Sequence, residues 1–383
     1  MFLVIPFLAL MSAATSTGPL PRPGNFAEIA RQADAARTAD RMGEAIRLYR
    51  EAVRLRPSWN QGWWWLGTLF YDQDRFPEAQ AALTRMVAIA PKPGPAHAML
   101  ALCEYELEDY PHSLKHFEDW AHGRSPGTDD LGDVAAFHWA LLLTRQGRFE
   151  QALYLLGGRA RRRGETPPLI EAMGLASLHL ARLPQEAPPE WRERIWLAGK
   201  AAFGASLSNF EGSHEYSSRL LAHYGQEPNV HYFLGTLFAA EHKNAEAGAE
   251  FRQELQISSQ HVPAMLALAE AELGGYRLAE AESLARRAVE VESKNPDAHH
   301  LLGRILLVAG QAQRSVGELE LAKRLDPERS AIRFHLASAY RELGRKQDAE
   351  RELAAYSALQ KREANLSGSG KAESTGGDVK APR

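Results

Sequence analysis

The chain has 383 residues and a formal net charge of -3 at neutral pH, with 45% hydrophobic and 24% charged residues. This near-neutral balance excludes a global electrostatic attraction to nucleic acid or to an acidic membrane. The single cysteine, Cys103, excludes an intramolecular disulfide and a cysteine metal cluster, and its apolar neighbours favour a packing role.

The N-terminus starts with an apolar run from Phe2 to Met11, which the small residues Ser12, Ala13 and Ala14 follow. The run has the length of the hydrophobic region of a secretory signal, and a bilayer span takes about 20 apolar residues. No lysine or arginine precedes Arg22. We interpret residues 1–21 as a signal-like segment with cleavage near Ala14 and expect an exported protein, periplasmic or secreted. The alternative is an uncleaved N-terminus on a cytoplasmic protein.

A repeat with a period of 34 residues follows. It is visible as paired apolar and small residues at Leu66-Gly67, Leu100-Ala101, Leu234-Gly235, Leu268-Ala269, Leu302-Gly303 and Leu336-Ala337. Each period predicts two helices. In residues 60–91 the first helix presents one apolar face, a polar break follows, and Ala79 marks the inward face of the second helix. The small residues Gly67 and Ala79 predict a close approach of the two helices.

These residues resemble the tetratricopeptide repeat family. Its pattern is matched by Trp63, Leu66, Gly67, Phe70, Ala79, Leu83 and Pro91, and a later copy carries Leu302, Gly303, Ala322 and Pro327. The resemblance implies an all-α fold, a right-handed α-solenoid of stacked helix-turn-helix repeats. We expect nine or ten helix pairs between residues 26 and 360.

The repeat phase is broken twice. It slips by five residues after Ser113, and three prolines follow an unpaired first helix near residues 167–190. We therefore divide the chain into an N-terminal array (22–166), an irregular joint (167–190), a C-terminal array (191–360) and a tail (361–383). The joint either bends the array or hinges it. The tail is expected to be disordered, because it has almost no apolar residues to bury.

In the family, the first helices of successive repeats line a concave groove. By resemblance, the residues expected to contact a partner there are Trp64, Thr68, Tyr71, Tyr105, Tyr232, His300, Arg304 and Arg341. Trp63 is expected in the core, and Trp65 against the neighbouring repeat. This face is aromatic and acidic at first and basic later, which suggests an extended partner with an acidic segment at the C-terminal end. Its N-terminal part includes no lysine, asparagine or arginine of the family's carboxylate clamp, since the residues there are Gln61, Trp64, Thr68, Ala98, Leu102, Phe137 and Leu141.

Signals for chemistry are weak. No nucleophile elbow, phosphate-binding glycine loop or H-E-x-x-H zinc motif is present. His112 and His116 have the i, i+4 spacing of a metal pair, although a solvated helix face explains them as well. The arginines between Arg159 and Arg163 form either a solvated surface or a contact for an anionic polymer.

We therefore predict a non-enzymatic scaffold that binds a protein or peptide. We expect no cofactor, no metal, no nucleic acid and no integral membrane span. One alternative is a binding module for a glycan or another envelope polymer, and a third reading is an enzyme with a metal on the histidine pair.

Overall fold

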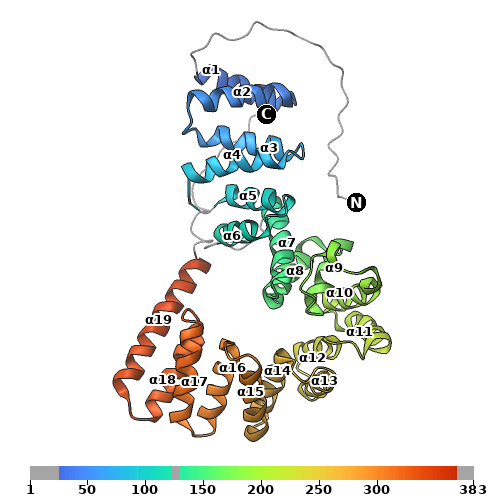
Figure 1. The fold of residues 1–383 in the computed structure, drawn as a ribbon, viewed down its shortest axis with the longest axis vertical. Helices are drawn as coiled ribbons and strands as arrows, with labels where there is room; N and C mark the ends of the chain where they lie inside the picture. Colours follow the sequence, from blue (N-terminus) through green and yellow to red (C-terminus); the bar gives the residue numbers. More distant parts are fainter. Residues whose placement is uncertain (1–25, 93, 122–128, 369–383) are drawn as a thin grey trace, which may run out of the picture. The chain divides into compact units, whose positions relative to one another are not determined.

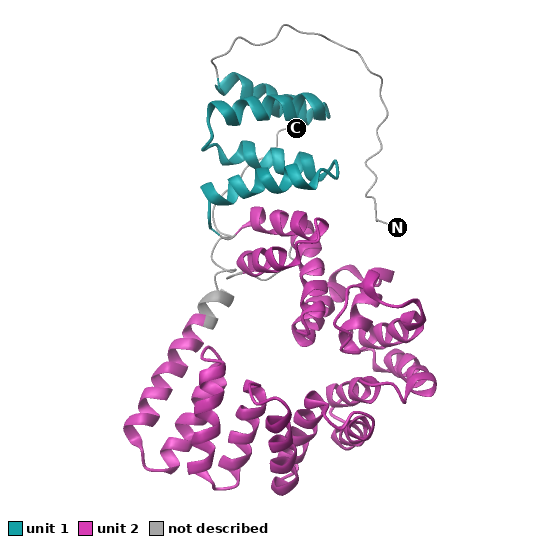
Figure 2. Cartoon of the chain, viewed as in Figure 1, with its two compact units in different colours: residues 1–92 teal, residues 93–383 magenta. Residues whose placement is uncertain are grey.

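The computed structural model describes residues 26–92, 94–121 and 129–368, and these residues form helices and turns without a strand. The chain divides into two compact units, residues 1–92 and residues 93–383 (Figure 2). The signal-like segment 1–21 and its cleavage site lie outside the described residues. Within the described part, no helix combines the length and the apolar character that a membrane crossing requires.

Both units consist of helices that follow one another as packed neighbours (Figure 1). Unit 1 contains α1 (Phe26–Thr38), α2 (Met42–Leu55), α3 (Asn60–Tyr71) and α4 (Phe76–Ile89). Unit 2 contains α5 (Pro95–Glu106), α6 (Tyr110–Ala121), α7 (Asp130–Arg145), α8 (Phe149–Arg163), α9 (Pro167–Ser177), α10 (Arg192–Ser206), α11 (Phe210–Tyr224), α12 (Val230–Ala240), α13 (Asn244–Ile257), α14 (Val262–Gly274), α15 (Leu278–Val291), α16 (Pro296–Val308), α17 (Ala312–Leu325), α18 (Ser330–Glu342) and α19 (Lys346–Gly368). The expected all-α solenoid is confirmed.

One spacing defines the pairs. In nine pairs among the described helices, a buried small residue on the first helix is followed 12 positions later by a buried small residue on the second. These residues are Ala33 and Ala45, Gly67 and Ala79, Ala101 and Ser113, Ala140 and Ala152, Ala201 and Ser213, Gly235 and Ala247, Ala269 and Ala281, Gly303 and Ser315, and Ala337 and Ala349. The expected count of nine or ten pairs is therefore confirmed.

Glycine on the first helix accommodates a leucine from the second. A Cβ atom at Gly67 would lie 2.5 Å from Cγ of Leu83, and one at Gly303 would lie 2.6 Å from Cγ of Leu319. Ala79, fully buried, lies four residues before Leu83. The prediction that Gly67 and Ala79 meet is thus refined, because the leucine one turn after the alanine fills the space above the glycine.

The other residues that carried the repeat pattern occupy comparable places. Leu66 and Leu302 are buried, as is Ala322. Pro91 and Pro327 come just after the ends of α4 and α17, where proline costs no helical hydrogen bond.

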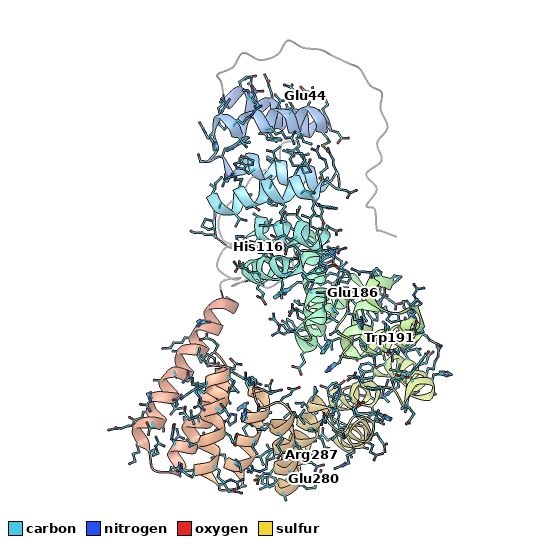
Figure 3. The ribbon with its side chains drawn as sticks, viewed as in Figure 1. Glu44, His116, Glu186, Trp191, Glu280 and Arg287 are labelled. Atoms are coloured by element: carbon cyan, nitrogen blue, oxygen red, sulfur yellow. The ribbon has the colours of Figure 1, made fainter. Side chains whose placement is uncertain are left out.

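The irregular joint is packed rather than loose. α9 ends in a turn like that of other first helices, with His179 at φ 51°, but two short 3-10 turns, Pro184–Glu186 and Pro189–Trp191, follow in place of a second helix. Figure 3 labels Glu186 and Trp191 in these turns. Arg145 of α7 donates to Glu186 at 3.1 Å, and the guanidinium of Arg194 lies 4.3 Å from the Trp191 ring.

Helix α10 then packs on α9 through two glycines. A Cβ atom at Gly174 would overlap the carbonyl oxygen of Ile195, and one at Gly199 would overlap the carbonyl oxygen of Ile170. The two backbones therefore touch at a reciprocal crossing. This contact speaks against a hinge between α9 and α10.

Two predicted boundaries need correction. The two compact units meet at Lys92 and Pro93 rather than in the segment 167–190. The sequence there, Pro91 to Pro95, contains three prolines and a glycine, a composition typical of domain boundaries. The tail predicted to be disordered from residue 361 is helical as far as Gly368, because α19 continues to that residue. Residues 369–383 lie outside the described residues.

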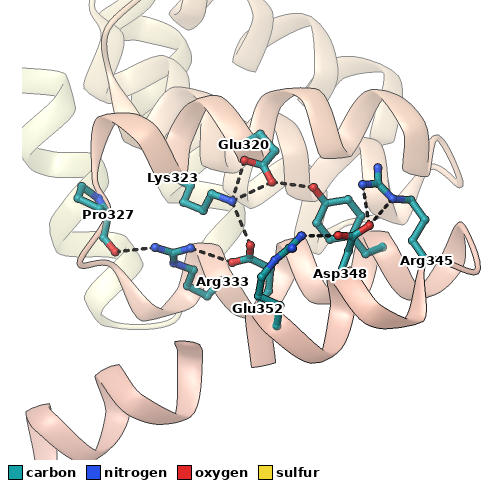
Figure 4. A network of polar contacts seen from close by, with 9 residues as sticks. Glu320, Lys323, Pro327, Arg333, Arg345, Asp348 and Glu352 are labelled. Atoms are coloured by element: carbon teal, nitrogen blue, oxygen red, sulfur yellow. Dashed lines mark hydrogen bonds and ion pairs between the residues drawn. The ribbon is translucent and has the colours of Figure 1, made fainter. Parts of the chain in front are cut away.

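A polar network joins the last three helices (Figure 4). The buried carboxylate of Glu352 on α19 accepts from Lys323 of α17 at 3.0 Å and from Arg333 of α18 at 2.9 Å. Glu320 accepts from Lys323 and from the Tyr340 hydroxyl. Removing one member would leave a buried charge without its partner, so we expect this network to fix α19 on the two preceding helices.

Candidate functional site

Three of the predicted groove residues meet in unit 2. Tyr232 of α12 and His300 and Arg304 of α16 line a cavity of about 680 Å³, together with residues 147–151 at the start of α8 and His179 after α9. A second cavity of about 750 Å³ shares Glu150, Tyr232, Ala267 and Glu270 with the first. We call the two adjoining cavities the unit 2 groove. First helices form one of its walls, as the resemblance implied.

Tyr232 forms the floor of this groove. Its ring centroid lies 4.8 Å from that of His179, 4.9 Å from His261 and 5.8 Å from Phe251. Its side chain is only 8% exposed. Burial raises the pKa of Tyr232 to about 12, and the nearby carboxylate of Glu150 adds to this effect. The phenol therefore stays protonated at neutral pH.

Two neutral imidazoles support this floor. His179 stacks on Phe149 with a centroid distance of 4.3 Å, and burial lowers the pKa of His179 to about 4. Nδ1 of His261 accepts the backbone N–H of Ala264, so Nε2 carries the proton and donates to Oδ1 of Asn229 at 2.7 Å. These contacts fix the rings between α8 and α14.

His300 is buried and neutral at the other end of the floor. Nδ1 of His335 lies 2.8 Å from the carbonyl oxygen of Ala331, so that nitrogen carries a proton. His300 Nε2, 3.0 Å from the same nitrogen, is therefore an acceptor. Burial is the first cause that lowers the pKa of His300 to about 3, followed by His335, Arg329 and Arg304.

The prediction of a basic groove is wrong. Arg304 donates to Glu270 at 2.8 Å and 3.0 Å. The other arginines of the groove also have carboxylate partners, namely Glu118 for Arg148, Glu272 for Arg252 and Arg277, and Asp297 for Arg329. By contrast, the exposed carboxylate of Glu150 forms no hydrogen bond or ion pair with a described residue. The ion pairs of these arginines therefore give no support to an acidic segment in the partner.

Two predicted residues lie elsewhere in unit 2. Tyr105 packs between Tyr110 and His138, with centroid distances of 5.6 Å and 4.8 Å, and burial raises its pKa. Arg341 is exposed on α18 and does not line either cavity. Neither residue joins Tyr232, His300 and Arg304. Tyr105 precedes the slip after α6 and the half-repeat at α9, and Arg341 is not a multiple of 34 residues from Arg304.

The three tryptophans of unit 1 have different surroundings. Trp63 is half-buried, and its Nε1 donates to the carbonyl oxygen of Pro57 at 2.8 Å. Trp65 lies under the guanidinium of Arg37 from α1, 3.7 Å from the ring centroid, so it packs on the neighbouring repeat. Trp64 is half-buried.

The other two predicted contact residues of unit 1 are also engaged within it. The Thr68 hydroxyl donates to the Trp65 carbonyl oxygen at 3.2 Å. Tyr71 meets Phe76 edge-to-face at 5.4 Å. Partner contact by Trp64, Thr68 and Tyr71 stays a prediction.

The histidine pair gains no support as a metal site. His112 bonds to Asp109 and His116 to Glu104, each within 3 Å. Across the described residues, no group of three or more His, Cys, Asp or Glu side chains is arranged to hold an ion. Cys103 is buried, and burial raises the pKa of its thiol to about 12, so it is not a thiolate at neutral pH.

Three arginines of the cluster pair with aspartates of α7. Asp133 pairs with Arg159 and Arg162, and Asp130 pairs with Arg163. Arg161 donates to the carbonyl oxygen of Ser206 at 3.2 Å. The basic patch on which the polymer-binding alternative rested is therefore engaged in intramolecular pairs.

Comparison with known proteins identifies repeats in two segments of the chain. The tetratricopeptide repeat model matches residues 31–92 and 265–328. These two segments therefore carry tetratricopeptide repeats. Such repeats form scaffolds for protein–protein interaction, and the match supports that role here. No curated protein matches the chain.

Several solved tetratricopeptide structures are similar to parts of the chain. A MamA crystal structure aligns over 50% of this chain and 100% of its own, with 16% identity and a TM-score of 0.40. MamA from Desulfovibrio magneticus RS-1 aligns over 44% and 93%, with 18% identity and a TM-score of 0.38. YrrB, described as a TPR protein with an unusual peptide-binding site, aligns over 48% and 94%, with 16% identity and a TM-score of 0.39.

Proposed function

We propose that this protein is a non-enzymatic scaffold that binds an extended segment of a partner protein in the unit 2 groove. The observation that carries the proposal is the pair of adjoining cavities, of about 680 Å³ and 750 Å³, on the face of first helices around Tyr232. Aromatic side chains on such a face contribute strongly to binding energy. The repeat match supplies the class of function.

The floor of the groove is rigid and its rim is polar. Tyr232 and His300 are held by ring contacts and hydrogen bonds, so little side-chain entropy is lost when a partner covers them. The rim carries ion pairs such as Arg304 with Glu270. This combination is typical of a binding surface with a preformed centre.

A second contact surface is proposed in unit 1 at Trp64, Thr68 and Tyr71. We also propose export, from the apolar run at Phe2 to Met11. Both proposals rest on the sequence.

The test is affinity capture with the full chain from an envelope extract, read by mass spectrometry and mapped by cross-linking. Ala267 on α14 lines both cavities, and Ala267→Gln would fill the groove without introducing a charge. The matched control is Ala279→Gln, an exposed position on α15. We expect Ala267→Gln to lose proteins that the parent and the control capture, with cross-links near α14 and α16.

Equal capture by all three chains would overturn the groove assignment. A Trp64→Ala/Tyr71→Ala chain runs beside them. Proteins lost only there would place the contact in unit 1.

A further inference from the structure

We propose that the segment bound in the unit 2 groove carries a lysine or arginine side chain, which the carboxylates of Glu150 and Glu292 receive. The inference rests on the proposed function and specifies the chemistry of the partner. It reverses the acidic partner that the sequence suggested.

The arginines of the groove are already paired with carboxylates. Arg304 shares two hydrogen bonds with Glu270, and Arg329 is paired with Asp297. An acidic ligand would have to compete with these carboxylates for the guanidinium groups. A cationic ligand would break no existing ion pair, because it would bind carboxylates that form no ion pair with a described lysine or arginine.

Glu150 is one such carboxylate. It is the second residue of α8, is exposed, and lines both cavities. The N-terminus of α8 stabilises a negative charge at this place. Glu150 forms no ion pair with any described side chain.

Glu292 also lines the first cavity, at the C-terminal end of α15. Its hydrogen bond comes from the neutral amide of Asn295, at 2.7 Å. A helix C-terminus already carries a partial negative charge, so a carboxylate there is disfavoured until a cation approaches. A ligand cation would relieve this repulsion.

The side chain of Tyr232 points to a ligand independently of these charges. Tyr232 is more than nine-tenths buried and lines both cavities. Its hydroxyl has no hydrogen-bond partner within the part of the chain that the structure describes. The protonated phenol can donate to a backbone carbonyl of the bound segment and accept from an ammonium or guanidinium group.

The test uses synthetic nonapeptides with a central Lys, Arg, Gln or Glu between randomised positions, captured on the full chain. Enriched sequences are then labelled and measured by fluorescence anisotropy at several salt concentrations. The variants are Glu150→Gln, Glu292→Gln and Tyr232→Phe. The control is Glu211→Gln, because Phe210-Glu211 begins α11 as Phe149-Glu150 begins α8, and Glu211 does not line the groove.

We expect enrichment of peptides with a central Lys or Arg. Their affinity should fall about threefold to tenfold in Glu150→Gln and in Glu292→Gln, with a weaker dependence on salt, and should be unchanged in Glu211→Gln. Tyr232→Phe should lower the affinity for neutral and for basic peptides to the same extent. Each variant is checked for an unchanged helical circular dichroism spectrum.

Two results would overturn the inference. Enrichment of Gln or Glu peptides that Ala267→Gln abolishes would reject the basic ligand and leave the groove function standing. Enrichment of Lys or Arg peptides whose affinity is unchanged in Glu150→Gln and in Glu292→Gln would also reject the role of the two carboxylates and leave the groove function standing. If no peptide is enriched and Ala267→Gln has no effect on protein capture, both the inference and the groove function fail.

Discussion

The pairs α16/α17 and α9/α10 both depend on glycine, but what each glycine meets is different. At Gly303 the close neighbour is the side chain of Leu319, 2.6 Å from where a Cβ atom would lie. At Gly174 and Gly199 the neighbours are the main-chain carbonyl oxygens of Ile195 and Ile170. A leucine side chain can change its rotamer, whereas a helical carbonyl can move only with its helix.

This difference separates the repeat from its interruption. A regular pair keeps its spacing through side chains, so sequence variation is absorbed locally. The α9/α10 crossing keeps its spacing through the backbone, and it holds His179, which forms part of the groove floor. His179 closely follows α9, so the place of this helix sets the place of the imidazole in the groove.

The largest effect is expected at the crossing. Gly174→Ala should destabilise unit 2 by about 3 kcal/mol or more, because the added methyl group forces α9 and α10 apart. Thermal unfolding and hydrogen exchange over α9 and α10 measure this. Gly199→Ala should destabilise unit 2 to a similar extent. The double variant should lose less unfolding free energy than the two single variants together, because one separation of the helices relieves both contacts. Exchange that is unchanged in α9 would contradict the backbone contact.

A smaller effect is expected in the regular pair. Gly303→Ala should cost about 1–3 kcal/mol, since Leu319 must shift in a packed core. Gly317 is exposed on α17, with no neighbour for a Cβ atom within 4 Å. Gly317→Ala should therefore stabilise the same pair by about 0.5–1 kcal/mol. Melting temperatures that move in the same direction for both variants would sink this interpretation.

The repeat itself could be predicted because its signals are local. Small residues and apolar spacings recur every 34 residues, and the same step brought Tyr232, His300 and Arg304 to one groove. The ion pair of Arg304 could also have been predicted from the sequence, because Glu270 lies 34 residues before it. Reading charges singly, rather than across successive repeats, led to the wrong prediction of a basic groove.

The rest of the site depends on contacts that no period encodes. Glu150 and His179 reach the groove only because the phase slips after α6 and α9 lacks its second helix. The crossing of α9 and α10 brings together Gly174 and Gly199, whose spacing belongs to no repeat. The boundary between the units could have been predicted from the prolines and the glycine between Pro91 and Pro95.

The imidazole at the joint should make stability depend on pH. His179 has a pKa of about 4 in the folded protein, against about 6.5 in an unfolded chain. The unfolded state therefore binds more protons between these values, and stability falls as the pH drops from 6.5 toward 4. His179→Asn tolerates the left-handed backbone and should remove about 1–2 kcal/mol of the loss between pH 6.5 and 5.

The control for this variant is His242→Asn. His242 is exposed and occupies the same kind of turn after α12, with φ 61°. Urea unfolding at pH 7, 6 and 5 compares the three chains. An equal slope of stability against pH in the parent and in His179→Asn would show that another buried histidine carries the effect.

The smallest effect separates two serines at the same place in their pairs. The Ser315 hydroxyl donates to the carbonyl oxygen of Gly303 at 2.7 Å, whereas the buried Ser213 hydroxyl, in the pair that follows the joint, has no partner among the described residues. Ser315→Ala should cost about 0.5–1 kcal/mol, because one hydrogen bond is lost and alanine already fills this place at Ala281. Ser213→Ala should be neutral or stabilising, since it removes a buried hydroxyl that lacks a hydrogen bond. If the unfolding free energy falls equally in both variants, α10 and α11 pack as a regular pair. The irregular packing would then be confined to α9 and the two 3-10 turns after it.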